Sequence, residues 1–268
     1  MPAISLGTDA PDYLPRIVRE HGIRLGHIKV GLWQGIEGAR REAAVMPELP
    51  VLVHGDNHLA GPGLLPQSEI DDLAALLDDT RSRWFSAHIE YRTPEEFEAA
   101  RATRYTAPDM PRYEAMERIV RRAEQLRREL PVPLLLENLP HWPAHNPDHA
   151  ADPDFIAEAL LETGCDMLLD LSHSRVSGGL LGLPDEEYLF RLPLGKVMEV
   201  HVSGPRPKDG ILRDVHEPMG EEDYALLGWL LRRTHVEAVT LEYWKDADAH
   251  AEQLLRLREI VEQAESLI

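Results

Sequence analysis

The chain has 268 residues, of which 47 are Asp or Glu and 28 are Lys or Arg, so its formal net charge is −19. This charge argues against a protein that binds duplex DNA, because phosphate contacts need clustered Lys and Arg. The single cysteine, Cys165, excludes an intramolecular disulfide and a metal site built from several thiolates, and the 43% share of hydrophobic residues is ordinary for a globular protein.

The same features set an expectation for the cellular compartment. The first residues, Met-Pro-Ala-Ile-Ser-Leu, lack the pattern of a secretory signal, and no apolar run approaches the length of a membrane span. A lone cysteine suits a reducing environment. We therefore expect a cytoplasmic protein that binds neither a membrane nor nucleic acid.

Strand-like apolar runs and helical patterns alternate along the chain. The first half is predicted to contain strand Ala3–Thr8, helix Pro11–His21, strand Arg24–Trp33, helix Ile36–Val45, strand Pro50–Gly55, helix Gln67–Thr80, strand Arg83–Tyr91, short helix Pro94–Ala102 and helix Tyr113–Leu130. The second half is predicted to contain strand Val132–Asn138, helix Pro153–Thr163, strand Asp166–His173, helix Asp185–Arg191, strand Lys196–Ser203, helix Glu221–Thr234, strand Glu237–Trp244 and helix Ala247–Ser266. Between these elements we predict a Pro-rich loop at 141–153, a Gly-rich turn at 177–184 and a long loop at 204–220.

About eight strand-then-helix units with no linker between them are typical of a (β/α)8 barrel, whose usual length is roughly 250 residues. We therefore predict an α/β fold, a single TIM barrel over residues 1–268. Its parallel strands are buried on both faces, which agrees with the continuous apolar runs. In this fold the active site lies at the C-terminal ends of the strands.

Those strand ends carry His, Asp and Glu repeatedly. The residues concerned are His54, His88, Glu137 with Asn138, Asp170 with His173, Glu199 with His201, and Glu242. A single histidine or acid at a strand end is more often a structural residue than a metal ligand. Four such histidines (His54, His88, His173 and His201) and three such acids (Glu137, Asp170 and Glu242) on one predicted face are harder to explain, because uncompensated carboxylates repel one another and cations are the natural remedy.

The loop after the seventh strand adds Asp214-Val-His216, which could reach over the barrel mouth or could form a solvated turn. Mixed imidazole and carboxylate ligands suit iron, manganese or zinc. The candidates outnumber the ligands of one ion, so we expect two or three ions.

In chain order these motifs resemble the multinuclear non-heme iron-dependent oxidative enzymes, a family that includes the methanobactin-biosynthesis oxidase and lies within the xylose-isomerase-like barrel group. The resemblance rests on His54-Gly55, Ser86-Ala-His88, Glu137-Asn138, Asp170-x-x-His173, Glu199-Val-His201-x-x-Gly204, Asp214-x-His216 and Leu241-Glu242. It implies a barrel that holds two or three irons and uses O2 to oxidise a Cys or Asp/Asn side chain of a ribosomally made peptide, which a partner protein can present.

The resemblance also implies roles for individual residues. The implied metal ligands are His54, His88, Glu137, Asn138, Asp170, His173, His201, Asp214, His216 and Glu242, with Asn138 either a ligand or an amide that orients one. Within this set, Glu137, Asp170, His173 and Asp214 are the implied catalytic residues.

The chain departs from the family pattern in three places. The second strand lacks the usual Glu-x-His, Trp142 stands where Tyr is usual, and Glu90 is an extra acid, either a further ligand or directed away from the mouth.

Other readings stay open. A zinc- or manganese-dependent hydrolase or sugar isomerase of the same barrel group uses similar ligands, although an isomerase needs a lysine near the metals and the strand ends offer only Lys245. A barrel that stores or presents metal without catalysis is a third possibility.

Two loop features are open as well. His141, His145 and His149 are expected in an exposed loop that prolines interrupt. Arg206, Lys208 and Arg213 are expected either to anchor a substrate carboxylate or to form a solvated lid.

Overall fold

The computed structural model describes residues 3–55, 58–102, 110–140 and 149–266. Within them, parallel strands close into a barrel in the order β1-β10-β7-β6-β5-β4-β3-β2. The barrel strands are β1 Ser5–Asp9, β2 His27–Gly31, β3 Val51–Gly55, β4 Phe85–His88, β5 Leu134–Glu137, β6 Asp166–Asp170, β7 Val197–Val202 and β10 Ala238–Leu241. The predicted (β/α)8 barrel is confirmed, although several strands, such as β2 and β4, are shorter than expected.

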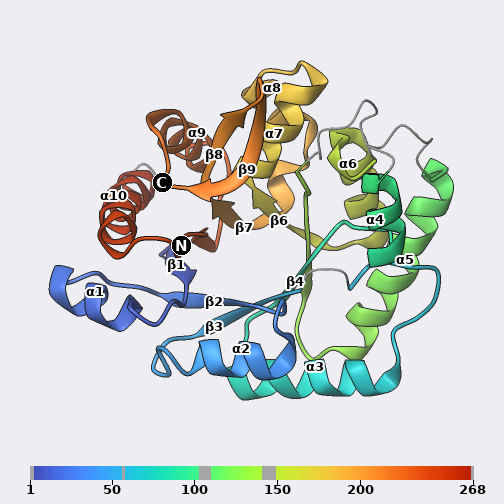
Figure 1. Cartoon of the computed structure of the whole chain (residues 1–268), viewed down its shortest axis with the longest axis horizontal. Coiled ribbons are helices and arrows are strands. Elements are labelled where there is room, and N and C mark those ends of the chain that lie inside the picture. Colours follow the sequence, from blue (N-terminus) through green and yellow to red (C-terminus); the bar gives the residue numbers. More distant parts are fainter. Residues whose placement is uncertain (1–2, 56–57, 103–109, 141–148, 267–268) are drawn as a thin grey trace.

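Helices surround the barrel (Figure 1). They are α1 Leu14–His21, α2 Gly35–Ala43, α3 Gln67–Thr80, α4 Pro94–Ala102, α5 Arg112–Glu129, α6 Pro153–Thr163, α7 Leu171–Leu181, α8 Asp185–Arg191, α9 Glu221–Leu231 and α10 Ala247–Glu265, with short 3-10 turns at His149–Ala151 and Leu194–Lys196. Helices α1 and α6 end where the sequence predicted, because Gly22 (φ 62°) and Gly164 (φ 66°) adopt the left-handed conformation that closes a helix.

The inside of the barrel has an apolar floor. Leu52, Leu135, Leu168 and Ala238, from four different strands, form one buried cluster with Trp84, the residue before β4. Successive side chains of a strand point to opposite faces, so the residues two and four positions further along point inward as well. On β3, β5 and β6, the residue two places after the floor is a histidine or an acid. The polar site therefore lies directly above the floor, at the C-terminal end of the barrel.

The chain between 166 and 184 differs from the prediction. Strand β6 ends at Asp170 and helix α7 starts at Leu171, so a strand that reaches His173 and a Gly-rich turn at 177–184 were both wrong. The reason is a helix cap. The Asp170 side chain accepts a hydrogen bond from the backbone N–H of His173 at 2.7 Å, which starts the helix immediately after the strand.

The predicted loop at 204–220 is also wrong over most of its length. It forms an antiparallel hairpin of β8 Gly204–Lys208 and β9 Ile211–Glu217, which packs against α7 (Figure 1). Asp209 (φ 55°) and Gly210 (φ 77°) form its turn. An Asp-Gly pair with two positive φ angles is the usual signal for a tight hairpin. The hairpin matters because it carries Asp214 and His216.

The buried His250 of α10 should make the stability of the fold depend on pH. Its ring is hydrogen bonded to Thr8 Oγ1 at 2.7 Å and to Tyr13 Oη at 3.1 Å, and burial lowers its pKa to about 4. The unfolded chain therefore binds one more proton between pH ~6.5 and pH ~4. Stability is full above pH ~6.5 and is lost as the pH falls, by about 3 kcal/mol at pH ~4.

Urea unfolding at pH 7 and pH 4.5 measures this loss. We expect His250→Gln to lose less stability between these two pH values than the wild type does. His235→Gln, at an exposed histidine, should behave like the wild type. Equal losses for the wild type and His250→Gln would contradict the assignment.

Candidate metal centre

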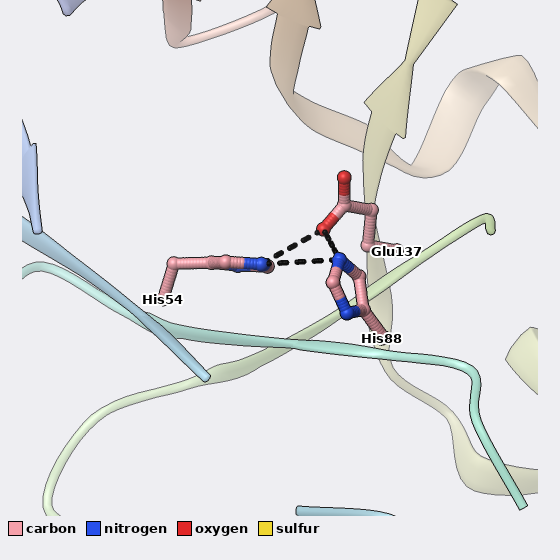
Figure 2. A group of neighbouring side chains, drawn as sticks. All are labelled: His54, His88 and Glu137. Atoms are coloured by element: carbon pink, nitrogen blue, oxygen red, sulfur yellow. Dashed lines mark hydrogen bonds and ion pairs between the residues drawn. The ribbon is translucent and has the colours of Figure 1, made fainter. Parts of the chain in front are cut away.

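Glu137 stands at the centre of the polar cluster above the floor. Its Oε2 lies 3.2 Å from His54 Nε2 and 3.1 Å from His88 Nε2, and these two nitrogens are 3.3 Å apart. Figure 2 shows both rings directing a nitrogen at the same carboxylate oxygen, from three neighbouring strands. Ligand atoms of all three residues lie within 4.8 Å of one another, which is close enough to share one metal ion.

Glu137 also belongs to a second group of this kind. Its carboxylate, Asp170 and His201 bring ligand atoms within 4.8 Å of one another, and all three residues are fully buried. Glu137 Oε1 lies 3.6 Å from His201 Nδ1. One carboxylate shared by two ligand groups is a geometry that suits two adjacent ions bridged by it.

The hydrogen-bond inventory supports a cation here. Glu137 Oε2, Asp170 Oδ2 and His201 Nδ1 are buried and make no hydrogen bond of good geometry, although histidine or carboxylate atoms lie 3.1–3.9 Å from each. Buried polar atoms in folded proteins are nearly always hydrogen bonded, so three ligand atoms without such a bond in one cluster call for an explanation. A metal ion fits, since carboxylate oxygen and imidazole nitrogen are ligands of iron, manganese and zinc.

The pKa shifts in the cluster also favour a bound cation. Burial raises the pKa of Asp170 to about 7. Burial by itself lowers the pKa of His201 and of His173. The neighbouring carboxylates, chiefly Glu242 at His201 and Asp170 at His173, have the larger effect, so the pKa of each ring lies well above its ordinary value. These two rings thus help to neutralise the carboxylates, and a metal ion held here would take over that task while the rings give up their protons.

His54 differs from those two histidines. Burial lowers its pKa to about 3, so its ring is neutral at physiological pH and ready to act as a ligand. Its Nδ1 is hydrogen bonded to Ser86 Oγ at 2.8 Å, which leaves Nε2 facing Glu137. Ser86 therefore fixes which nitrogen the ring presents to the site.

Asn138 locks the strand β5 to the start of α7. Its Nδ2 donates to Asp170 O at 2.9 Å, and its Oδ1 accepts from Asp170 N at 2.9 Å. His173 Nδ1 lies 2.8 Å from Asn138 O. The geometry favours the orienting role that the sequence left open for Asn138, since its amide already holds Asp170 in place.

The hairpin brings Asp214 and His216 to the mouth, as the sequence suggested, and they do not form a solvated turn. Asp214 Oδ2 lies 3.4 Å from His173 Nε2, and His216 Nε2 lies 3.1 Å from Glu242 Oε2. His216 has a φ of 48°, in the left-handed region that only a few per cent of non-glycine residues adopt. Each of the ten predicted site residues thus contacts another member of the set: His54, His88, Glu137, Asn138, Asp170, His173, His201, Asp214, His216 and Glu242. Their role as ligands stays a prediction.

Glu199 supports His201 from below, a role that the sequence did not assign. Its Oε1 lies 3.1 Å from His201 Nε2, and its carboxylate also accepts hydrogen bonds of 2.6 Å from Thr240 Oγ1 and from Trp84 Nε1. Burial alone raises the pKa of Glu199, but His201 outweighs it and the pKa falls to about 2. An ionised Glu199 holds the Nε2–H of His201 and leaves Nδ1 for the site. The Glu-x-His spacing on one strand face was the available signal.

Lys29 on β2 was missed as well. The expectation that only Lys245 could stand near the centre was wrong: Lys245 is exposed and bonds Glu217 Oε1 at 2.7 Å, whereas Lys29 Nζ pairs with Asp9 and Glu242 inside the barrel. Burial by itself lowers the pKa of Lys29, but the two carboxylates have the larger effect, so the pKa of Lys29 is raised above its ordinary value. Strand β2 is short and fully buried, and its side chains point alternately to the inside and the outside of the barrel. Lys29 lies at a position that points inward.

The other open residues lie away from the ligand groups. Glu90 lines the cavity, but Arg92 binds its carboxylate in a buried pair, with Nε–Oε1 at 2.9 Å. His149 is hydrogen bonded to Met110 O at 2.8 Å. His141, His145 and Trp142 fall outside the described residues. Arg206 donates to the carbonyl of Pro205 at 2.7 Å, and the described residues that line the cavity do not include Arg206, Lys208 or Arg213.

A cavity of about 1300 Å³ leads to the centre, and His88, His173 and Asp214 are among the residues that line it. Two exposed tryptophans, Trp33 and Trp244, also line this cavity. Trp33 is 53% exposed, and its ring centre lies 5.5 Å from that of His54. Trp244 is 48% exposed, and its ring centre lies 5.0 Å from that of His216. In the part of the chain that the structure covers, no helix combines the length and the apolar character needed to cross a bilayer.

Comparison with known proteins gives a family match. Residues 32–267 match the profile described as RiPP precursor modification enzyme MbnB/TglH/ChrH. A UPF0276 protein of Caulobacter vibrioides is 29% identical over 187 residues, which are 68% of this chain and 65% of that protein. A UPF0276 protein of Bordetella pertussis is 33% identical over 134 residues, 48% of this chain and 46% of that protein. The aligned part of the chain thus spans 65% of the length of the first of these relatives and 46% of the second.

Solved structures with the same architecture are more distant in sequence. A D-tagatose 3-epimerase-like protein has a TM-score of 0.61 at 14% identity, covering 98% of this chain and 99% of that one. Endonuclease IV from Thermus thermophilus has a TM-score of 0.58 at 16% identity, covering 97% of this chain and 99% of that one. A xylose isomerase-like TIM barrel protein from Mycobacterium smegmatis, in complex with magnesium, has a TM-score of 0.58 at 16% identity over the whole of both chains. These similarities establish a xylose-isomerase-like barrel fold.

The role of Glu199 can be tested by Glu199→Gln. Three donors point at its carboxylate, and an amide must turn one N–H toward a donor, so we expect a loss of about 1–3 kcal/mol in unfolding free energy. We also expect metal affinity to fall about 10–100-fold, because the His201 ring is no longer held. Urea unfolding and metal titration measure the two effects. Glu186→Gln, at an exposed glutamate of α8, should change neither, and wild-type metal affinity in Glu199→Gln would refute the positioning role.

Proposed function

This chain belongs to the MbnB/TglH/ChrH family of RiPP precursor modification enzymes, and we propose that it uses O2 and a multinuclear iron centre to oxidise a side chain of a ribosomally made peptide. The observation that carries the proposal is the carboxylate of Glu137, which belongs to both groups of converging ligand atoms. The target side chain in this proposal is Cys or Asp/Asn. We place the reaction in the cytoplasm, and a partner protein can present the peptide.

In the proposal, one ion is held by His54, His88 and Glu137, and a second by Glu137, Asp170 and His201. When bound, iron supplies the one-electron chemistry that oxidation by O2 requires. Asn138 and Glu199 orient Asp170 and His201. The remaining predicted ligands, His173, Asp214, His216 and Glu242, form the wall of the site toward the hairpin.

His173 and Asp214 are the proposed groups for proton transfer. Their closest atoms, Nε2 and Oδ2, are 3.4 Å apart, and both residues line the cavity. Asp170 is also close, since its Oδ2 lies 3.9 Å from the same nitrogen. A proton shared among these atoms can move to or from a substrate group in the cavity without crossing bulk solvent.

The shape of the entrance supports a peptide as substrate. A cavity of about 1300 Å³ exceeds the space that one side chain needs and accommodates the flanking residues of a peptide as well. The rings of Trp33 and Trp244 offer apolar surface with a polar edge, which suits contact with an extended chain.

A zinc- or manganese-dependent hydrolase or sugar isomerase is the second candidate. The chain shares its fold with proteins described as epimerases and with an endonuclease. The observation that favours this candidate is Lys29, since an isomerase needs a lysine beside its metals. However, the Nζ of Lys29 is paired with both Asp9 and Glu242, so its donors are already engaged by carboxylates of the chain.

Metal content after anaerobic expression in iron-supplemented medium tests the proposal. We expect at least two irons per chain and an optical spectrum that changes on exposure to air. Stoichiometric zinc or manganese without a response to oxygen would instead favour the second candidate. A protein without bound metal would refute the centre itself.

Substitutions in the two ligand groups give a sharper expectation. Glu137→Gln should lose both ions because this carboxylate serves both groups, whereas His88→Ala should lose about one. Elemental analysis of the folded variants measures the difference. Glu252→Gln, at an exposed glutamate of α10, is the matched control and should keep the full content. Equal metal loss in Glu137→Gln and His88→Ala would contradict the shared carboxylate.

A further inference from the structure

Lys29 places an ammonium group inside the barrel mouth. Its side chain is 3% exposed, and Nζ lies 3.0 Å from Asp9 Oδ1 and bonds Glu242 Oε1. Lys29 also borders the cavity that leads to the two ligand groups. A lysine held by two carboxylates in a buried site acts as a fixed counter-ion rather than as a free amine.

Glu242 already has a partner for each of its oxygens. Oε1 is bound by Lys29 and lies 3.2 Å from His201 Nδ1, and Oε2 lies 3.1 Å from His216 Nε2. This differs from Glu137, whose Oε2 lies between two histidine nitrogens, at 3.2 and 3.1 Å, whereas Glu242 is bound by a lysine ammonium. The carboxylate that the sequence predicted as a ligand is thus already bonded, by the Lys29 ammonium at Oε1 and by His216 at Oε2.

Asp214, His216 and Glu242 do not converge on one point. His216 directs Nε2 to Glu242, but it is Nδ1 that lies 3.6 Å from Asp214 Oδ2. The two nitrogens of an imidazole point in different directions, so the ring links the two acids in a row. Neither of the two converging groups found among the described residues includes any of these three.

These contacts form a continuous row from Asp214 through His216, Glu242 and Lys29 to Asp9. We propose that the Lys29 ammonium stands in place of a third metal ion, so that the centre holds two ions, with Glu242 a partner of Lys29 rather than a ligand. The inference rests on the proposed metal centre. A dication at Glu242 would lie against the ammonium in a buried site, where like charges are poorly screened.

The number of ions per chain tests the inference. We compare the full-length wild type with Lys29→Met, which has a similar length and no charge, after anaerobic loading with ferrous iron and removal of unbound metal. Elemental analysis should give two ions for the wild type and about three for Lys29→Met. Anomalous scattering from crystals of the variant should place the additional ion beside Glu242.

Lys196→Met is the matched control. It removes the same charge from a lysine in the 3-10 turn just before β7, where Nζ donates to Cys165 O at 3.0 Å, away from the mouth. It should keep two ions. Circular dichroism checks that each variant is folded.

The outcomes separate the inference from the proposed function. Three ions in the wild type, or two in folded Lys29→Met, would overturn the inference and leave the metal centre standing. No bound metal in the wild type would overturn the centre itself. If Lys29→Met does not fold, the wild-type anomalous map decides: a peak bonded to Glu242 overturns the inference, and two peaks at the Glu137 groups alone support it.

Discussion

The burial of several carboxylates at one barrel mouth is the constraint on which the rest of the structure depends. Glu137, Asp170 and Glu242 are each at most 5% exposed. Acids cannot be buried side by side unless cations or hydrogen-bond donors replace the lost hydration. The chain supplies part of this compensation itself, through Lys29 and the histidines. One carboxylate oxygen of Glu137 and one of Asp170 still make no hydrogen bond. A metal ion held there would balance the buried charge and would also supply the proposed chemistry.

The barrel meets this requirement in layers. The apolar cluster around Leu52, Trp84 and Leu135 closes the bottom, and the Trp84 indole donates upward to Glu199. Glu199 in turn orients His201. A site built this way has ring orientations that are set before any ion or substrate arrives, which lowers the cost of binding both. The side toward the cavity is less enclosed, with Trp33 and Trp244 exposed where a peptide must approach.

Much of the fold follows from local patterns in the sequence. Apolar runs gave the strands, and Gly22 and Gly164 marked two helix ends, because each of these signals acts within a few residues. The errors arose where a local signal was overlooked. Asp170 was read as the middle of a strand although its side chain caps α7, and Asp209-Gly210 was read as loop although the pair forms a hairpin turn. Both errors changed the route of the chain to the site without changing which residues reach it.

The sequence alone was sufficient to place His54, His88, Glu137 and Asp170 at strand ends that converge on the barrel mouth, because an apolar run and the polar residue that ends it are neighbours in the chain. It could not show that Glu137 is shared by two groups while Lys29 occupies Glu242. Lys29 and Glu242 are 213 residues apart, and they meet only because β1, between β2 and β10, closes the barrel. The pairing of acidic and basic side chains depends on distances across the closed barrel, so only the tertiary structure decided which groups neutralise one another.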